Sequence, residues 1–341
     1  MTINRDYVLT LAKDILTIPS PSGYTDEIVT RIKQEAHAYD LPYVQDKKGN
    51  LIITLEGQSD KTVGLSVHVD TLGAMVRSIT DKGTLKFSSI GGPLWPSLDG
   101  EYCTIITRDN KHYTGTILST SPAVHVYKDA KNKERTPETM EVRIDEAVKN
   151  KADVEALGIN HGDYIVFDPK TTVTPSGYIK SRFLDDKINV ASMFGLIDAM
   201  KRDGVKPSHT VKIIISTYEE VGHGAAHIPD MDEFIAVDMG CIGDDLACTE
   251  HDVSICAKDS SGPYDYDLTS RFKTMAKANN INHAVDIYPF YGSDVSAARR
   301  GGNDFKGALI GPGVHASHGM ERTHYDAVKS TIELLYQYLI T

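Results

Sequence analysis

Short apolar segments alternate with helical patterns in two separate parts of this chain, and no other sequence feature restricts the fold as strongly. The apolar segments, each of strand length, lie at 51–55, 63–67, 211–216, 234–237 and 307–310. The pattern at 188–201 is that of an amphipathic helix, and helical periodicity also covers 5–17, 25–38, 267–279 and 326–339. This alternation predicts an α/β fold in which a mixed central sheet is covered by helices on both faces.

The pattern changes between residues 72 and 171, where β-like segments are short and are separated by Gly, Asp, Asn and Lys turns. The strands predicted there lie at 85–90, 102–107, 113–118 and 164–167. A charged stretch at 128–141 is interpreted as a surface loop. We therefore expect one domain whose first part is 1–71 and whose second part is 172–341, interrupted by a β-rich insert at 72–171.

Composition excludes several classes of protein. The 341 residues are 40% apolar and 24% charged, which is typical of a chain that buries a core. The net charge of −11 provides no overall basic field for nucleic acid, and no apolar run approaches the ~20 residues of a membrane span. The amphipathic N-terminal segment lacks the pattern of a secretory signal, and the four cysteines form no CxxC pair. We expect a cytoplasmic protein with reduced thiols that binds neither membranes nor nucleic acid.

The first candidate site follows the apolar segment 63–67. The period of two along a strand places His68 and Asp70 on the same face. A histidine that binds a metal usually donates its second ring N–H to a carboxylate, and Asp70 is placed to accept it. A hydrogen bond between these side chains without a metal explains the same pattern.

Carboxylates form the next three candidates. Asp185 and Asp186 precede the predicted helix at 188–201, where one of them caps the helix or bridges two cations. Glu219 and Glu220 follow a strand, and adjacent carboxylates there are costly unless they are solvated or coordinated. An acidic loop is the alternative for the Glu pair. Asp238 ends another apolar strand in the same way.

Histidines form the last candidate, just before the final helix, at His315, His318 and His324. A polar surface loop is the alternative interpretation. In open α/β sheets, however, ligands bind at the carboxyl ends of the strands, where most of these clusters stand. Two histidines and three carboxylates suit a pair of divalent cations with open positions for water. Their charges balance, since two such cations offset three carboxylates and one hydroxide.

Together these motifs resemble those of the TET-type aminopeptidases, a dinuclear-metal family that includes glutamyl and leucyl aminopeptidases and was once labelled endoglucanases. The resemblance covers almost the whole chain. It rests on IPSPSG at 18–23, DKKGNL at 46–51, HVDTLGAMV at 68–76, LDDK at 184–187, EEVG at 219–222 and YGSD at 291–294. It implies a catalytic α/β domain of the zinc-exopeptidase type, interrupted by a small β-barrel-like dimerisation domain. It also implies homo-oligomers, either dimers or tetrahedral dodecamers.

The resemblance also implies roles for single residues. The implied ligands are His68, Asp185 and Asp238 for one metal ion, and Asp185, Glu220 and His318 for the second. Asp185 would then bridge the two ions, Glu219 would be the general base, and Asp70 would orient His68. The segment at 316–324 departs from the family pattern, so the last ligand is His318 or His324. Tyr218 and His223 also differ from the residues usual beside the Glu pair, which leaves the substrate preference open.

The function that follows is removal of N-terminal residues from peptides by a water that two divalent ions, Zn, Co or Mn, activate. A deacylase or amidase that acts on small N-acylated or amidated peptides would use the same metals. A glycosidase that uses the Glu219–Glu220 pair leaves the histidines unexplained, because retaining enzymes place two carboxyls about 5 Å apart across a sugar ring. A binding protein without catalysis would not need the whole ligand set together with a base.

Overall fold

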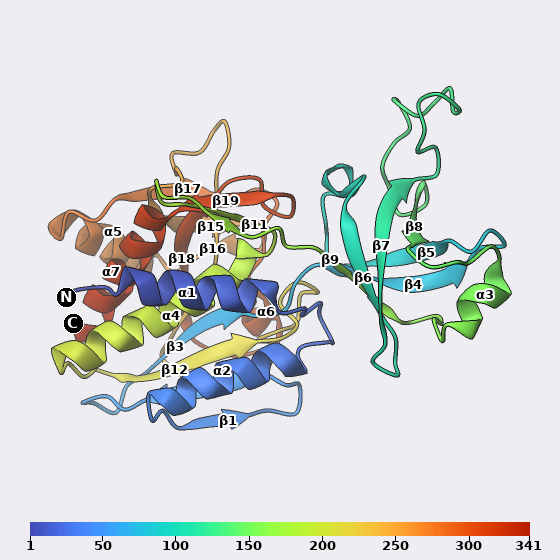
Figure 1. Cartoon of the computed structure of the whole chain (residues 1–341). Helices are drawn as coiled ribbons and strands as arrows, with labels where there is room; N and C mark the ends of the chain where they lie inside the picture. Colours follow the sequence, from blue (N-terminus) through green and yellow to red (C-terminus); the bar gives the residue numbers. More distant parts are fainter. The chain divides into compact units, whose positions relative to one another are not determined.

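The computed structural model describes all 341 residues and divides into two compact units. One unit combines Met1–Thr71 with Lys170–Thr341, and the other is Leu72–Pro169 (Figure 1). The first unit is built around a mixed ten-stranded sheet and the second around a closed barrel. No helix in the structure is both long enough and apolar enough to cross a membrane.

The order of the strands in the large sheet brings the carboxyl ends of four parallel strands close together. The order is β1 (Tyr43–Gln45), β2 (Leu51–Leu55), β12 (Thr210–Ser216), β3 (Thr62–His68), β13 (Glu233–Val237), β18 (Lys306–Val314), β15 (Val253–Asp259) and β16 (Gly262–Pro263), with β14 (Gly240–Cys241) on β18 and β17 (His283–Ile287) on β15. β12, β3, β13 and β18 are parallel neighbours. Their register pairs Ser216 with His68 and Val237 with Ile310, so the polar residues that follow these strands emerge close together.

Helices cover both faces of this sheet, which confirms the predicted fold class. They are α1 (Arg5–Thr17), α2 (Asp26–Ala38), α4 (Leu184–Asp203), α5 (Tyr266–Ala278), α6 (Asp294–Arg300) and α7 (Tyr325–Ile340). On one face α4 packs against β3 and α7 against β18. On the other face Val295 and Ala298 of α6 join a core with Ile214, Phe234 and Leu309 from the strands.

Helix α4 corrects one expectation, because it is not amphipathic. Most of its residues are buried on every side, including the polar Asn189 and Ser192. The reason is its position, since α1 and α7 pack on α4 while β3 lies against it (Figure 1). The helix ends at Gly204, which adopts the left-handed conformation that glycine favours.

A second, three-stranded sheet consists of β10 (Thr172–Val173), β11 (Tyr178–Ser181) and β19 (Glu321–His324), none of which the sequence patterns revealed. β11 and β19 are antiparallel and pair Ser181 with Glu321 and Tyr178 with His324. β11 leads directly into the turn before α4, and β19 leads into α7. This small sheet therefore joins the two chain segments that carry Asp185 and His318.

The unit Leu72–Pro169 is a closed six-stranded antiparallel barrel. Its strands follow the order β4 (Gly73–Ile79), β5 (Leu85–Ile90), β8 (Met140–Ile144), β7 (His112–Ser119), β6 (Tyr102–Ile106) and β9 (Tyr164–Phe167), accompanied by helix α3 (Lys151–Ala156) and the short helix η1 (Trp95–Leu98). Phe87, Trp95 and Phe167 pack together, with the first two rings stacked 4.9 Å apart. The charged stretch expected as a loop is irregular up to Thr139, but its last two residues begin β8.

Candidate active site

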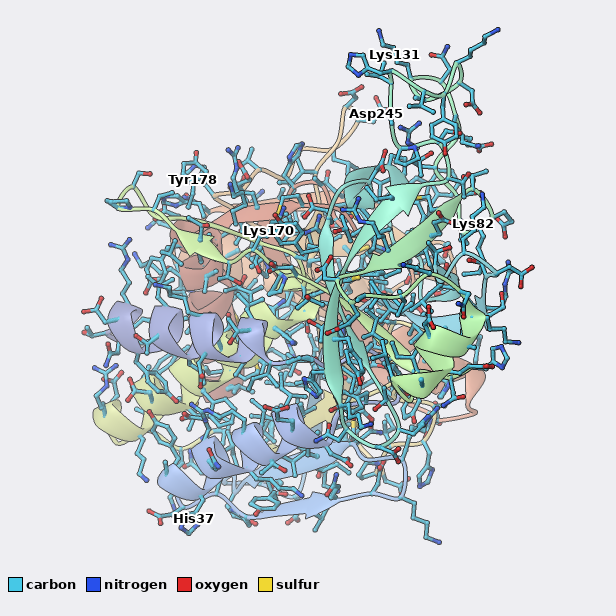
Figure 2. All side chains as sticks on the ribbon, turned by 45° about the vertical axis from the view of Figure 1, so that its right-hand side comes forward. His37, Lys82, Lys131, Lys170, Tyr178 and Asp245 are labelled. Carbon is cyan, nitrogen blue, oxygen red and sulfur yellow. The ribbon has the colours of Figure 1, made fainter.

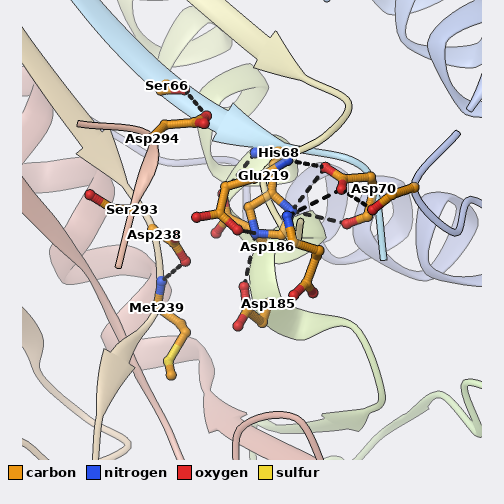
Figure 3. Close-up of polar contacts among 12 residues, drawn as sticks. Ser66, His68, Asp70, Asp185, Asp186, Glu219, Asp238, Met239, Ser293 and Asp294 are labelled. Atoms are coloured by element: carbon orange, nitrogen blue, oxygen red, sulfur yellow. Dashed lines mark hydrogen bonds and ion pairs between the residues drawn. The ribbon is translucent and has the colours of Figure 1, made fainter. Parts of the chain in front are cut away.

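The carboxyl ends of the parallel strands carry a buried cluster of histidine and carboxylates (Figure 3). β3 contributes His68 as its last residue, β12 runs into Glu219 and Glu220, and β13 runs into Asp238. The start of α4 adds Asp185 and Asp186, and the segment after β18 adds His318. The structure thus brings together residues that lie up to 250 positions apart in the sequence, all within the unit that contains the large sheet.

His68 is the centre of the cluster. Its Nε2 lies 3.0 Å from Oδ1 of Asp185 and 3.8 Å from Oε2 of Glu219. Its other ring nitrogen, Nδ1, donates to the backbone carbonyl of Asp70 at 2.9 Å, while the nearest carboxylate oxygen of Asp70 is 3.7 Å away. The sequence predicts that the Asp70 carboxylate orients His68, and the structure assigns this contact to the Asp70 carbonyl. Nε2 is thereby left facing the carboxylates.

The Asp70 carboxylate holds the Glu pair instead. Its two oxygens accept the backbone N–H of Glu219 at 3.0 Å and of Glu220 at 3.2 Å. The hydroxyl of Ser22, from the IPSPSG segment, donates to the same carboxylate at 2.5 Å. Asp70 is completely buried, and this burial raises the pKa of its carboxyl group. Its three donors fix the turn that carries Glu219 and Glu220.

The Asp185 carboxylate lies between two imidazoles. Oδ1 faces Nε2 of His68 at 3.0 Å, and Oδ2 faces Nε2 of His318 at 3.5 Å. His318 also lies 3.6 Å from Oε2 of Glu220. Burial opposes ionisation of Asp185, but its contacts with His318 and His68 outweigh that effect and lower its pKa. The two oxygens of Asp185 therefore face different imidazoles.

His324 lies in a different environment from His318. Its Nε2 donates to the carbonyl of Ser176 at 2.8 Å, and its Nδ1 accepts the backbone N–H of Asp326 as the cap of α7. Its imidazole packs against the phenol ring of Tyr178 and the imidazole of His251. None of these contacts involves Asp185 or Glu220.

Two further buried carboxylates organise the site, and the sequence did not reveal the role of either one. Asp186 accepts the backbone N–H of His68 at 3.1 Å and the amide of Asn189 at 2.6 Å. Glu321 accepts the backbone N–H of Asp185 at 3.1 Å and of His318 at 2.9 Å. Asp186 stood beside Asp185 in the sequence without a signal to separate their roles. For Glu321, the only sign in the sequence was its position three residues after His318.

Burial raises the pKa of most carboxyl groups in this cluster. The pKa values of Glu219, Glu220 and Asp186 all lie well above the ordinary range, and neighbouring carboxylates add to the effect of burial. Burial and the charge of Asp185 raise the pKa of Asp238 to about 7, and the same causes raise that of Glu321 to about 8. A buried cluster with this many carboxyl groups needs bound protons or cations to balance its negative charge.

The donors present fit divalent cations. Oε1 of Glu220 is buried and has no hydrogen-bond partner, as expected for an oxygen reserved for a cation. Two groups of potential ligand atoms, each within 4.8 Å of one another, are His68 with Asp185 and Glu220, and His68 with Asp186 and Asp238. Mixed imidazole and carboxylate donors are typical of sites for Zn, Co and Mn.

Residues outside the cluster support its loops. Asp294, from the YGSD segment, accepts the hydroxyl of Ser66 at 2.6 Å and the backbone N–H of Ala225 at 2.9 Å. The unusual pair beside the glutamates, Tyr218 and His223, stacks with ring centroids 4.9 Å apart. This stack is a local feature of the loop that carries Glu219 and Glu220.

Comparison with known proteins gives consistent matches. The sequence profile of the M42 glutamyl aminopeptidase family matches residues 49–334. The YhfE protein of Bacillus subtilis, named as a candidate aminopeptidase, is 46% identical over 332 residues, with 96% of each chain covered. The glutamyl aminopeptidase of Lactococcus lactis is 26% identical over 245 residues, which cover 68% of this chain and 66% of that one.

Solved structures share the fold. A TET aminopeptidase from a marine sediment thaumarchaeote superposes with a TM-score of 0.89 at 22% identity, covering 99% of this chain and 97% of that one. The TET1 peptidase of Pyrococcus horikoshii, described as assembling into a tetrahedron or a large octahedral shell, gives a TM-score of 0.85 at 24% identity. That superposition covers 98% of this chain and 99% of the other.

Proposed function

Because this chain belongs to the M42 glutamyl aminopeptidase family and is a metal-dependent aminopeptidase, we propose that the cluster around Asp185 is its catalytic centre. The observation that carries this proposal is the Asp185 carboxylate, which faces His68 with one oxygen and His318 with the other. A carboxylate so placed can bridge two cations, and the partnerless oxygen of Glu220 lies in the same cluster.

The ligand sets that we propose are those that the family resemblance implies. His68, Asp185 and Asp238 would hold one ion, and Asp185, Glu220 and His318 the other, with Zn, Co or Mn as the ions. Asp186 lies close enough to His68 and Asp238 to be considered as well. Its two oxygens already accept the backbone N–H of His68 and the amide of Asn189, so we assign it a positioning role.

When bound, two divalent cations supply electrostatic polarisation of the scissile carbonyl and a lowered pKa for water. Glu219 would accept the proton of the attacking water at a side-chain oxygen and pass it to the leaving amine. Its side chain is 15% exposed, against 3% for that of Glu220, so water reaches Glu219 more easily. Asp70 holds both glutamates in place through their backbone N–H groups.

The choice between an aminopeptidase and a deacylase is tested by the substrate. After chelation and addition of Zn, Co or Mn, we expect hydrolysis of aminoacyl amides and of peptides with a free N-terminus. N-acetylated versions of the same peptides should remain intact, because they lack a free α-amine. The measurement is release of the N-terminal residue, with the chelated protein as control. Faster hydrolysis of the acetylated peptides than of the free ones would contradict an aminopeptidase activity and favour the deacylase.

We also propose that the barrel unit mediates assembly into a homo-oligomer. Val124, Val126 and Tyr127 expose large apolar side chains in its long loop, and Val126 is 72% exposed. Apolar residues exposed together commonly mark contact surfaces. The TET1 peptidase of similar fold is described as assembling into closed shells, which also favours an oligomer.

Removal of the barrel unit tests this role. Replacing residues 72–169 by a short Gly/Ser linker should leave a folded α/β unit, because that unit has its own sheet and core. We expect light scattering to report a monomer and circular dichroism to report retained helix. The matched variant Val126→Asp, in the full-length chain, should weaken assembly without loss of fold. An unchanged assembly state after the deletion would contradict the proposal.

A further inference from the structure

A second cluster of potential metal ligands lies outside the catalytic centre. His251, His324 and Asp326 offer ligand atoms that all lie within 4.8 Å of one another. Nδ1 of His251 and Nδ1 of His324 are each 3.1 Å from the same oxygen, Oδ2 of Asp326. A tetrahedral site with bonds of about 2.0–2.1 Å has ligand atoms roughly 3.3 Å apart, so these separations match such a site closely.

The hydrogen bonds of His324 favour a cation in this place. Its Nε2–H donates to the carbonyl of Ser176 at 2.8 Å, as the second nitrogen of a metal-binding histidine commonly does. In the neutral imidazole, Nδ1 then carries a lone pair that faces Oδ2 of Asp326 at 3.1 Å. Two acceptors this close repel each other unless a proton or a metal ion lies between them.

Helix capping alone does not explain the arrangement. Nδ1 of His324 also accepts the backbone N–H of Asp326 at 3.1 Å, and a bound ion would replace this contact. The cap accounts for His324 but not for His251, which comes from a different loop and points Nδ1 at the same carboxylate oxygen. The neighbouring carboxylate of Glu250 is not available as a ligand, because it forms a bidentate ion pair with Arg322 at 2.6 and 2.9 Å.

The surrounding chain is built closely around His324. Gly177 has φ of +101°, and a Cβ at this position would lie 2.5 Å from Nε2 of His324. Tyr178, labelled in Figure 2, packs edge-on against both imidazoles, with ring centroids 4.9 Å from His324 and 6.0 Å from His251. The backbone N–H of His324 donates to the carbonyl of Glu250 at 3.1 Å, which fixes the loop of His251 beside it.

We propose that His251, His324 and Asp326 form a third, mononuclear metal site on the surface of the α/β unit. Two imidazoles and one carboxylate select zinc-like transition metals over Mg²⁺ or Ca²⁺, which prefer oxygen ligands. The side chains of His251 and Asp326 are 43% and 50% exposed, so water completes the coordination of an ion bound there. The ion would link the loop at 249–252, the end of β19 and the start of α7.

Metal content after equilibrium dialysis tests the site. The wild-type protein, chelated and then dialysed against Co²⁺, should hold one ion per chain more than the His251→Ala variant. His324→Asn should also lose that ion, since asparagine keeps a helix cap without an imidazole. The control His37→Ala, which removes an exposed histidine elsewhere on the α/β unit, should bind as much cobalt as the wild type.

Two further results bear on the proposal. Anomalous scattering from zinc-soaked crystals should show an ion among His251, His324 and Asp326, and Zn²⁺ should raise the melting temperature more in the wild type than in His251→Ala. Equal cobalt content in all variants, with no anomalous peak at this place, would mean that a proton joins these groups and would overturn the site. This test does not depend on the catalytic role of Asp185.

Discussion

Substitution of Glu219 by glutamine should lower kcat by roughly 10²–10⁴-fold, the usual contribution of a general base. Glutamine keeps the size of the side chain but cannot accept a proton from water at neutral pH. Its backbone N–H would still donate to Asp70, so the turn should keep its shape. We therefore expect the variant to lose turnover and to keep the metal content of the wild type.

Glu220→Gln is the matched comparison for Glu219→Gln. Glu220 has a buried oxygen without a partner and lies beside His318, as expected for a ligand. That substitution should lower metal content as well as activity. Steady-state kinetics and elemental analysis of both variants separate the two roles. Loss of metal from Glu219→Gln with retention in Glu220→Gln would mean that the base and the ligand are exchanged.

Substitution of His318 by alanine should abolish activity and remove one ion from the catalytic centre. Nε2 of His318 lies 3.5 Å from Asp185 and 3.6 Å from Glu220, so its loss leaves the second ion with carboxylates alone. Imidazole ligands contribute much of the preference for Zn or Co over Mg²⁺. The expected variant therefore binds metal weakly even when divalent ions are supplied in excess.

His324→Asn is the control for His318→Ala. Its contacts are with Ser176, Asp326 and neighbouring rings, so activity should stay close to that of the wild type. Both variants should be made in the His251→Ala background, so that an ion at the proposed surface site does not enter the count. Full activity in the His318 variant and loss of activity in the His324 variant would assign the last ligand to His324.

Much of the fold was predictable because parallel strands in a covered sheet are continuous apolar runs, and each run here stops at a polar residue. The extents of β12 and β13 therefore differ from the predicted strands by only one residue each. The small sheet of β10, β11 and β19 was not predictable, because its strands have two to four residues and mixed polarity. The burial of α4 on all sides depends on packing with α1 and α7, which its own sequence does not encode.

The candidate site, like the fold, was predictable from the sequence only in part. The sequence identified which segments carry the carboxylates of the site, because these segments follow parallel strands whose carboxyl ends lie close together. It did not show that Asp70 accepts from the Glu219 and Glu220 backbone, since that contact joins residues about 150 positions apart. The role of Asp186 depends on which way each of two adjacent carboxylates points. The directions of these two side chains can be determined only from a three-dimensional structure.

The single carboxylate of Glu321 has a consequence for the thermodynamics of metal loading. It accepts the backbone N–H of both Asp185 and His318, and β19 pairs with β11 immediately beside it. The backbones of two proposed ligands are thus ordered while the chain folds, and little conformational entropy remains to be lost when ions bind. If the centre binds the two ions that we propose, their affinities should be correlated, because Glu321 positions the backbones of both Asp185 and His318.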